Sequence, residues 1–427
     1  MRVHWPHAGL AEATRMTHRC AVIGAGAVGT AVALHLQRDG HEVVLLERDR
    51  PAAGASFGNS GAIVNGSCAP TAMPGVWKEA LRAIVDPLAP FSLRPSYLPK
   101  ALPWLLRFLS ASKQSRLVGL SNALYSLSRH ATSEWLALAA GTPIAEYLDE
   151  SHWLKIYETE RGFAGTADAR ALIDANEAAY TLLSAEDIRE LEPSLAPIYS
   201  AGILQPNGLR ITSPGRLVES MVNSFVAAGG RFEKASVNAL TPNGDQVEVA
   251  TGGPTYRVDR AVIALGAWSR PLAASLGDDV PLDAERGYHM MLPAGSEALL
   301  SRPVVNAERF FVLSPMLGGM RMTSQSELAG VDAPPDYRRI RRLLPEAKRM
   351  LPDLEAGESS VWMGGRPSLP DSLPVIGHST RSPNILYAFG HQHLGMTLAA
   401  ITGRLVAELA GGRETAVDLS PFRPDRF

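Results

Sequence analysis

Short apolar runs and glycine turns alternate in the first strongly patterned part of the chain. An apolar run at 20–23 leads into a glycine-rich turn at 24–29, and a periodic apolar stretch follows as far as Gly40. A second apolar run, 41–47, ends on an acidic residue. Apolar runs bounded by turn residues are typical of buried strands, and a periodic stretch that ends on glycine is typical of a helix. The pattern therefore predicts a strand–helix–strand unit, as found in doubly wound parallel sheets.

The pattern changes further along the chain. Prolines interrupt it after residue 86, and helical periodicity returns at 117–140. A helix is predicted at 213–230, because Pro214 lies near its start and glycines end it. The fully apolar run 261–265 is typical of a central parallel strand. These elements predict an α/β fold in which the parallel sheet is built from separate parts of the chain.

Composition and charge exclude several classes of protein. The 427 residues are 46% hydrophobic and 20% charged, which is ordinary for a globular protein and excludes a disordered or collagen-like chain. A net charge of −2 gives no sign of nucleic-acid binding. Two cysteines, Cys20 and Cys68, are too few for a disulfide framework or a zinc site made of cysteine pairs, so a reducing compartment and no metal are expected. Cys68 is interpreted as a small buried residue.

No apolar run approaches the roughly 18–20 residues that span a bilayer. The most hydrophobic surface candidate, residues 98–109, is interrupted by prolines and basic residues. Residues 1–16 are polar and have no place in the pattern, so we expect them to form a disordered leader rather than a signal peptide. The expected location is the cytoplasm, with peripheral contact with the inner face of the membrane left open.

The glycine turn has the spacing of a dinucleotide-binding site. Gly24, Gly26 and Gly29 follow a strand and open a helix, and Glu47 ends the next strand 18 residues later. Gly24 allows the tight turn, Gly26 allows a pyrophosphate to approach, and Gly29 allows the helix to approach the strand. Glu47 would bind a ribose diol and disfavours a 2′-phosphate. The alternative is a glycine turn without a ligand, and the unit alone does not distinguish NAD from FAD.

Further motifs occur at 53–61, 264–269, 365–377 and 384–397. With the glycine turn, they resemble the FAD-dependent D-amino-acid dehydrogenase and oxidase family, most closely its bacterial D-amino-acid dehydrogenase branch and D-hydroxyproline dehydrogenase-like members. The resemblance runs from about residue 17 to the end of the chain. It implies a Rossmann-type FAD-binding domain with a discontinuous α+β substrate domain. The boundaries that we expect are 17–85, 210–275 and 360–427 for the FAD-binding domain, and 86–209 and 276–359 for the substrate domain.

The resemblance also implies which residues bind FAD. The loop with Ser56, Asn59 and Gly61 would wrap polar groups around the flavin and its diphosphate, although an ordinary polar loop is the alternative. Gly266 would let the cofactor lie against a strand end. A helix at 395–411 would point its positive end at the flavin pyrimidine ring and stabilise the reduced anion. The expected cofactor-binding residues are Gly24, Gly26, Gly29, Glu47, Ser56, Asn59, Gly61, Val237, Gly266, Gly390, His391, Gly395, Met396 and Thr397.

Three residues are expected at the substrate. Arg366 precedes a proline-rich segment, where the resemblance implies a bidentate partner for the substrate carboxylate; a structural ion pair is the alternative. Tyr288 falls where the family often has a tyrosine beside the substrate, and core packing is the alternative. His393, like His391, faces the flavin or the substrate, or else is a solvated turn residue. The arginines at 338–342 are interpreted as a solvated helix face, the alternative being a docking patch for an electron acceptor or anionic lipid.

The activity implied is oxidation of the Cα–N bond of a D-amino or D-imino acid, for example D-hydroxyproline or a small D-amino acid. Hydride transfer from Cα to flavin N5 would give an imino acid, a keto acid after hydrolysis, or a pyrroline carboxylate. No acid–base pair is required if the amine reacts in its neutral form, so orientation and electrostatics are the protein's contribution. The electron acceptor would be a quinone, a carrier protein or oxygen. The alternatives are a sarcosine- or glycine-oxidase-like enzyme and a flavin-carrying subunit of a larger dehydrogenase complex.

Overall fold

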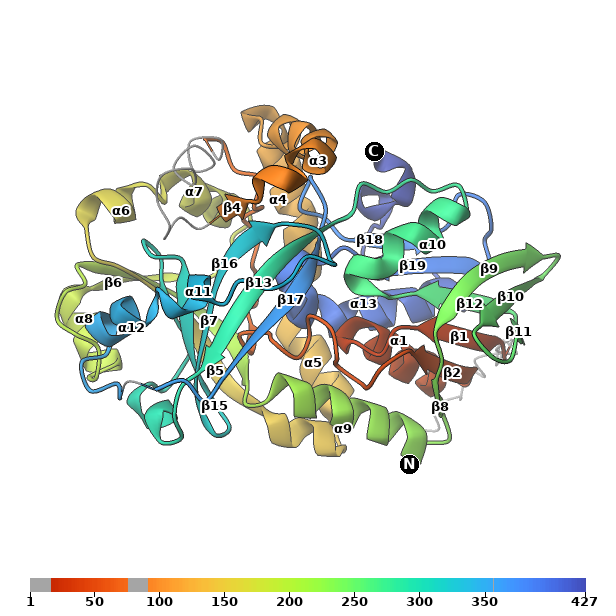
Figure 1. Cartoon of the computed structure of the whole chain (residues 1–427), viewed down its shortest axis with the longest axis horizontal. Helices are drawn as coiled ribbons and strands as arrows, with labels where there is room; N and C mark the ends of the chain where they lie inside the picture. The colour runs from red at the N-terminus through yellow and green to blue at the C-terminus, as the bar shows by residue number, and fades with distance from the viewer. Residues whose placement is uncertain (1–16, 76–90, 356) are drawn as a thin grey trace, which may run out of the picture.

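The computed structural model describes residues 17–75, 91–355 and 357–427. The leader expected at 1–16 lies outside the described residues. Two large sheets lie side by side in Figure 1, one on the right-hand side with β1 and β2 and one on the left with β5, β13 and β16. The mixed α/β architecture confirms the predicted fold class.

The first sheet contains the strand–helix–strand unit that the pattern predicts. It has six strands in the order β18–β19–β12–β1–β2–β8, all parallel to their neighbours except β18. Apolar runs form the central strands β1 and β12, whose residues are almost entirely buried. The strands are β1 (Arg19–Ile23), β2 (Glu42–Glu47), β8 (Arg231–Lys234), β12 (Arg260–Ile263), β18 (Val375–His378) and β19 (Ile385–Phe389).

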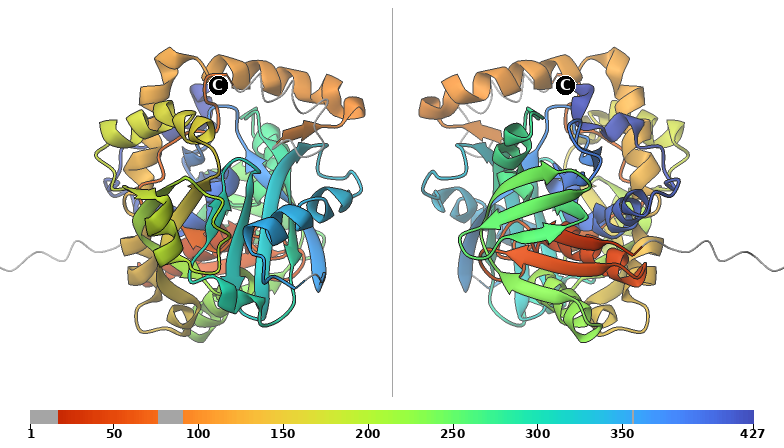
Figure 2. Two further views of the ribbon diagram at one scale, coloured as in Figure 1. Left: turned by 90° about the vertical axis from the view of Figure 1, so that its left-hand side faces the viewer. Right: turned by 90° about the vertical axis from the view of Figure 1, so that its right-hand side faces the viewer.

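Helices cover one face of this sheet, and a small antiparallel sheet covers the other. On the first face, α1 packs against α13, and a Cβ on Gly403 would lie 2.7 Å from the Ala31 backbone, so glycine lets the two helices approach. The second face is covered by the small sheet, whose strand order is β11–β10–β9, and by helix α10, as the right-hand view of Figure 2 shows. These elements are α1 (Ala27–Arg38), α9 (Pro214–Ala227), α10 (Ser269–Ser275), α13 (Gly395–Ala410), β9 (Val237–Asn243), β10 (Gln246–Thr251) and β11 (Tyr256–Val258).

The second large sheet has the strand order β17–β13–β16–β15–β14–β5–β7–β3, with β4 beside β16 and β6 beside β7. One face packs against α8, α11 and α12 around a core that includes Leu154, Phe311 and Met322. The strands are β3 (Ala62–Ile63), β4 (Phe91–Leu93), β5 (Leu148–Tyr157), β6 (Thr181–Ser184), β7 (Ala201–Ile211), β13 (Asp283–Met291), β14 (Val304–Asn306), β15 (Phe311–Met316), β16 (Gly319–Leu328) and β17 (Ser360–Ser368).

Three parts of the chain make contacts across the domain boundaries that we expect. Strands β17 and β3, expected in the FAD-binding domain, pair within the ten-stranded sheet. Helices α4 and α5, expected in the substrate domain, pack into the core around α1 and α13, where the Trp135 indole N–H donates to the Met396 carbonyl at 2.8 Å. Long-range strand pairing and helix docking decide these assignments, and neither is visible in local periodicity.

The remaining helices lie at the periphery or connect these layers. They are α3 (Leu98–Ala111), α4 (Gln114–Ser128), α5 (Ala131–Ala139), α6 (Glu160–Ala164), α7 (Ala167–Ala175), α8 (Ala185–Leu191), α11 (Arg338–Arg341) and α12 (Leu344–Met350), with short 3₁₀ helices at Pro95–Tyr97, Pro143–Tyr147, Gly266–Trp268, Ser296–Leu299, Gln392–Leu394, Ser420–Phe422 and Pro424–Arg426. Of the helices that the structure describes, none has both the length and the apolar content needed to cross a bilayer.

Candidate functional site

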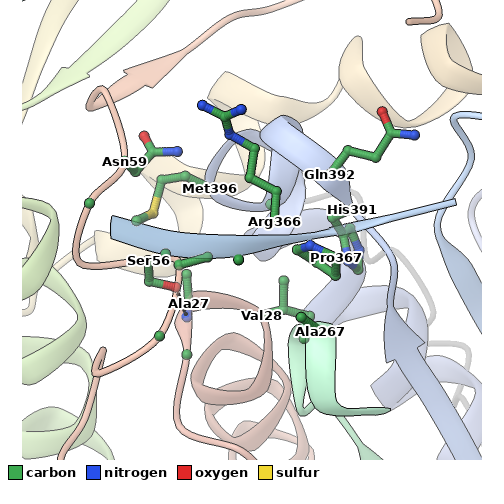
Figure 3. A pocket seen from close by; sticks show the side chains of 18 of the residues that line it. Ala27, Val28, Ser56, Asn59, Ala267, Arg366, Pro367, His391, Gln392 and Met396 are labelled. Atoms are coloured by element: carbon green, nitrogen blue, oxygen red, sulfur yellow. Dashed lines mark hydrogen bonds between the residues drawn. The ribbon is translucent and has the colours of Figure 1, made fainter. Parts of the chain in front are cut away.

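A cavity of about 760 Å³ lies between the carboxyl ends of the parallel strands and the second face of the ten-stranded sheet. Ligands of open α/β sheets bind at this edge. The β1–α1 turn, the loop at 53–60, β17 and the segment that enters α13 meet around it (Figure 3). The predicted residues that line the cavity are Gly24, Gly26, Glu47, Ser56, Asn59, Val237, Gly266, Tyr288, Arg366, His391, His393, Gly395, Met396 and Thr397. Gly29, Gly61 and Gly390 lie behind its wall.

The glycine turn has the geometry of a phosphate cradle. Gly24 has a φ of +109°, and a Cβ there would lie 2.5 Å from the Ala264 carbonyl oxygen. A Cβ on Gly29 would lie 1.9 Å from the carbonyl oxygen of Gly24, so helix α1 can approach the turn only with glycine here. At Gly26 a Cβ would project toward Ser56, 3.3 Å from its hydroxyl. The N-terminus of α1 has no side-chain cap at Gly26, which leaves its positive end available to an anion.

The next strand places a carboxylate beside this turn. Glu47 ends β2, and its two oxygens accept hydrogen bonds from the Ala25 N–H at 2.9 Å and the Asp49 N–H at 3.1 Å. From the opposite side, the Ser56 hydroxyl accepts a hydrogen bond from the Ala27 N–H at 3.0 Å. The turn is therefore held in shape by side chains on both sides of the cavity.

The loop after the turn is also fixed. The Asn59 side chain accepts a hydrogen bond from the Gly61 N–H at 2.7 Å, and Gly61 has a φ of +71°. Arg321 donates to the carbonyl oxygens of Phe57 and Asn59 at 3.0 and 2.8 Å, which anchors the loop to β16. Burial lowers the pKa of Arg321 to about 10.

Helix α13 begins at the cavity with Gly395, and the residue before it, Leu394, provides no side-chain cap. His391, just before it, points away from the cavity: its Nε2 lies 3.0 Å from the Thr402 hydroxyl and only 3% of the residue is exposed. Burial lowers the pKa of His391 to about 3, so the ring is neutral. The alternative that His391 is a solvated turn residue is wrong, because the ring is buried and contacts α13 through Thr402.

His393 borders the cavity itself. The residue is exposed, because its ring faces the cavity space. Burial, together with repulsion from Arg366 and Lys155, lowers the pKa of His393 to about 4, although Glu285 acts in the opposite direction. The ring is therefore neutral at physiological pH.

Arg366 lies on β17 directly opposite Glu285 of β13. Its Nη1 donates to the Ser326 hydroxyl at 2.9 Å and lies 3.4 Å from the Glu285 carboxylate. A Cβ on Gly287 would lie 2.5 Å from Nη2, so glycine makes room for the guanidinium. Figure 3 shows Arg366 and Pro367 extending to opposite sides of β17. The arginine thus lines the cavity and also forms the ion pair that was its alternative role.

Tyr288 lines the cavity, but its hydroxyl is directed into the core. Its side chain is 2% exposed in the core beneath the ten-stranded sheet, and its hydroxyl donates to Glu327 at 2.6 Å and accepts from the Asp336 N–H at 3.2 Å. These contacts fit the alternative of core packing, and a place for Tyr288 beside the substrate stays a prediction. Strand alternation directs the Tyr288 side chain toward α11 and its neighbours Gly287 and His289 toward the opposite side.

The cavity also has a residue that the sequence did not single out. Lys155 lines it from β5, in the middle of the ten-stranded sheet. Burial lowers the pKa of this amine. The available signal was a single lysine among the apolar residues of 153–157, a segment that was not predicted as a strand.

These residues fit FAD. The cavity runs from a glycine cradle and the N-terminus of α1, which suit a diphosphate, to the N-terminus of α13, which suits an electron-rich ring. Side chains larger than hydrogen at Gly26 would project into this path. The donor set is that of a dinucleotide rather than of a mononucleotide.

Comparisons with known proteins agree with this geometry. A D-amino-acid oxidase of Bradyrhizobium diazoefficiens is 36% identical, with 95% of this chain and 98% of the relative covered. A D-amino acid dehydrogenase of Allorhizobium ampelinum is 28% identical over 95% and 98% of the two chains. The solved glycine oxidase of Geobacillus kaustophilus shares the fold with a TM-score of 0.72 at 24% identity, covering 96% of this chain and all of that one. The family model for FAD dependent oxidoreductases, DAO, matches residues 19–409, and the chain therefore belongs to this family of FAD-dependent enzymes.

Proposed function

We propose that the protein oxidises the Cα–N bond of a D-amino or D-imino acid. The observation that carries this proposal is the position of Arg366, whose guanidinium has the geometry to bind a carboxylate, in the same cavity as the elements that fit FAD. Relatives named D-amino-acid oxidase and D-amino acid dehydrogenase, similar over almost the whole chain, support the choice of substrate class.

The chain's own residues would orient the substrate. Arg366 binds the α-carboxylate, and its ion pair with Glu285 and hydrogen bond to Ser326 hold the guanidinium in place. His393 is neutral above about pH 4 and accepts a hydrogen bond from the amino group without repelling it. When bound, FAD supplies the acceptor of the Cα hydride at N5, and the positive end of α13 favours the negative charge that the ring gains.

The balance of the reaction requires no further acid or base. The substrate ammonium loses one proton to solvent, and the Cα–H bond then breaks with its electron pair leaving as hydride. A primary amino acid gives an imino acid, which water hydrolyses to a keto acid and ammonia, and a cyclic substrate gives a pyrroline carboxylate. A quinone, a carrier protein or oxygen then removes the two electrons.

Anaerobic mixing of the holoenzyme with a panel of D- and L-amino acids and cyclic imino acids tests this proposal. We expect loss of the flavin absorbance with D-enantiomers and little with their L-enantiomers. Reduction by L-enantiomers alone, or by none of the panel, would contradict it. Reoxidation of the reduced enzyme in air and with a soluble quinone then distinguishes an oxidase from a dehydrogenase.

We further propose that helix α3 contacts an anionic membrane surface, where a quinone acceptor is found. Four leucines of α3 are 42–60% exposed, and their spacing places them on one stripe, away from Trp104, which packs against the protein. No acidic residue occurs between 87 and 133, and Figure 2 shows α3 along one edge of the molecule. The leucines are Leu98, Leu102, Leu106 and Leu109, and the exposed basic residues nearby are Lys100, Arg107, Lys113 and Arg116.

A helix with an apolar stripe and basic neighbours binds the interface of anionic lipids. We expect the holoenzyme to co-sediment with vesicles containing anionic lipid and less with neutral vesicles. Leu102→Ser/Leu106→Ser should reduce that binding without changing flavin reduction by substrate. Equal sedimentation of the variant and the unaltered protein would contradict a role for α3.

A further inference from the structure

Lys155 is a partly buried cation that the proposed reaction does not use. It lies in a row of directly paired residues across the ten-stranded sheet: Lys155 pairs with Val305, Val305 with Val312, and Val312 with Thr323. Directly paired residues point to the same face of a sheet, and Lys155, Val312 and Thr323 all line the cavity. Lys155 therefore belongs to the wall of the cavity that the ten-stranded sheet forms.

No described carboxylate neutralises this amine. The titratable group that acts on the pKa of Lys155 is the Cys68 thiol. Burial raises the pKa of that thiol, so the thiol is neutral and supplies no negative charge to pair with the amine. Among the described residues that line the cavity, the carboxylates are Glu47 and Asp49, both at the end of β2 beside the nucleotide-binding turn. A buried cation is costly unless an anion pairs with it.

Neutral hydrogen-bonding groups line the same cavity as Lys155. Gln205 is 4% exposed, lines the cavity from β7, and pairs in register with Trp153, which lines it from β5. The Thr323 hydroxyl lines the same wall and has no hydrogen-bond partner among the described residues. A carboxylate has four lone-pair positions and no proton to give, so an ammonium, an amide and a free hydroxyl suit it as donors.

The charge balance points the same way. Lys155 and Arg366 are two cations that both act on the His393 ring, and Glu285 contributes one negative charge through its pair with Arg366. This half of the cavity therefore carries one net positive charge. An amino acid with an uncharged side chain offers one carboxylate to these two cations. An amino acid with an acidic side chain offers one carboxylate to each of them.

We propose that Lys155 binds a carboxylate on the substrate side chain, so that the enzyme prefers acidic D-amino acids. This inference rests on the proposed function, in which Arg366 binds the α-carboxylate. The substrate then lies with its two carboxylates on Arg366 and Lys155 and its amino group toward His393. Lys155 is on this basis a specificity-determining residue.

Pairs of acids and their amides test the proposal, because they have nearly the same shape and differ in charge. Flavin reduction under anaerobic conditions is measured for D-aspartate against D-asparagine and for D-glutamate against D-glutamine. We expect the acid to exceed the amide in at least one pair by about 30-fold or more, the loss typical of a desolvated charge pair. The pair with the larger ratio indicates the span between Arg366 and Lys155.

Substitutions then assign that ratio to one side chain. Lys155→Met should bring the acid-to-amide ratio close to one, and Lys155→Arg should keep most of the preference. Lys348→Met, which removes an exposed lysine of α12, is the matched control and should leave the ratio unchanged. Flavin content and absorption spectrum are recorded for each variant, so that loss of cofactor is recognised.

The outcomes separate this inference from the proposed function. If neutral D-amino acids reduce the flavin and acidic ones do not, the inference fails and the proposed function stands. If no D-amino acid reduces it, the proposed function itself fails. An unchanged acid-to-amide ratio in Lys155→Met would overturn the proposal. If that variant loses activity uniformly for all substrates, Lys155 is assigned to the α-carboxylate. If its flavin potential shifts instead, Lys155 is assigned to the flavin.

Discussion

Replacing Arg366 with methionine should weaken catalysis strongly and leave the cofactor in place. The guanidinium is 24% exposed, and its protein partner Glu285 is 20% exposed, so a substrate carboxylate bound there is largely withdrawn from water. Truncating one member of a desolvated charge pair costs about 2–5 kcal/mol. That range corresponds to a loss of roughly 30-fold to several thousand-fold in kcat/KM. Methionine keeps most of the side-chain volume on β17, so packing changes little.

The same substitution has a smaller effect on stability. Arg366 Nη1 lies 3.4 Å from Glu285, a partly exposed pair, and such pairs contribute about 0–1 kcal/mol. We therefore expect a small decrease in the free energy of unfolding and an unchanged flavin spectrum. The expected readout is steady-state kcat/KM with a D-amino acid and with its carboxamide, whose carboxylate is absent. The ratio of kcat/KM for the amino acid to kcat/KM for its carboxamide should be smaller in the variant than in the unaltered enzyme.

Arg341→Met is a suitable control, because Arg341 pairs with Glu358 on an exposed surface outside the cavity. Kinetics equal to the unaltered enzyme in Arg366→Met would refute the carboxylate role. Loss of activity that merely follows loss of FAD would refute it as well. Two buried arginines near the cavity already have other partners, since Arg321 anchors the loop at 57–59 and Arg286 pairs with Glu327 at 3.5 Å.

Three further predictions follow from single contacts. Gly26→Val should abolish FAD binding, because the valine Cβ would lie 3.3 Å from the Ser56 hydroxyl and the valine methyl groups would occupy the path of the phosphates. The amount of flavin released on denaturation measures FAD binding, and a normal FAD content would contradict the prediction. Tyr288→Phe should lower the free energy of unfolding by about 1–3 kcal/mol with little change in kcat/KM, since Glu327 loses its 2.6 Å hydrogen bond. A large loss of kcat/KM without a loss of stability would instead indicate a catalytic role for Tyr288. Burial lowers the pKa of His391 to about 3, so the unfolded chain binds more protons than the folded one between about pH 6.5 and 3, and stability should fall as the pH is lowered through that window. His391→Gln should make this fall shallower in denaturation experiments from pH 7 to 4.5, and an unchanged slope would show that His391 does not contribute.

Local sequence was enough to predict the cofactor side of the cavity. The glycine turn, its helix and Glu47 lie within 24 consecutive residues, and their arrangement follows from strand–helix–strand geometry alone. The loop at 53–61 and the N-terminus of α13 could likewise be recognised because each is a contiguous segment. Their meeting in one cavity follows from the order of parallel strands.

The substrate side depends on pairing between distant strands, which the sequence does not reveal. Tyr288 and Lys155 each lie on a strand, and the face that each occupies depends on register. The pairing of β13 with β16 shifts between Arg286 and Tyr288, and that of β5 with β7 shifts between Ser151 and Trp153. Each such irregularity changes which residues face the cavity. A motif can therefore indicate the strand of Tyr288 without indicating the direction of its side chain.

The connection from β17 to β18 spans residues 369–374, and it joins the two large sheets. Arg366 lies near the end of the first strand, and the second strand belongs to the cofactor side. Near the C-terminus, Arg426 donates to the Asp371 carboxylate at 2.7 Å and to the Leu373 carbonyl at 2.7 Å, which fastens this connection. Six residues and one remote arginine thus connect Arg366, the proposed carboxylate anchor, to the cofactor side of the cavity. Removing the contacts of Arg426 with this connection would therefore disturb the alignment of the substrate Cα with its hydride acceptor without changing any residue that lines the cavity.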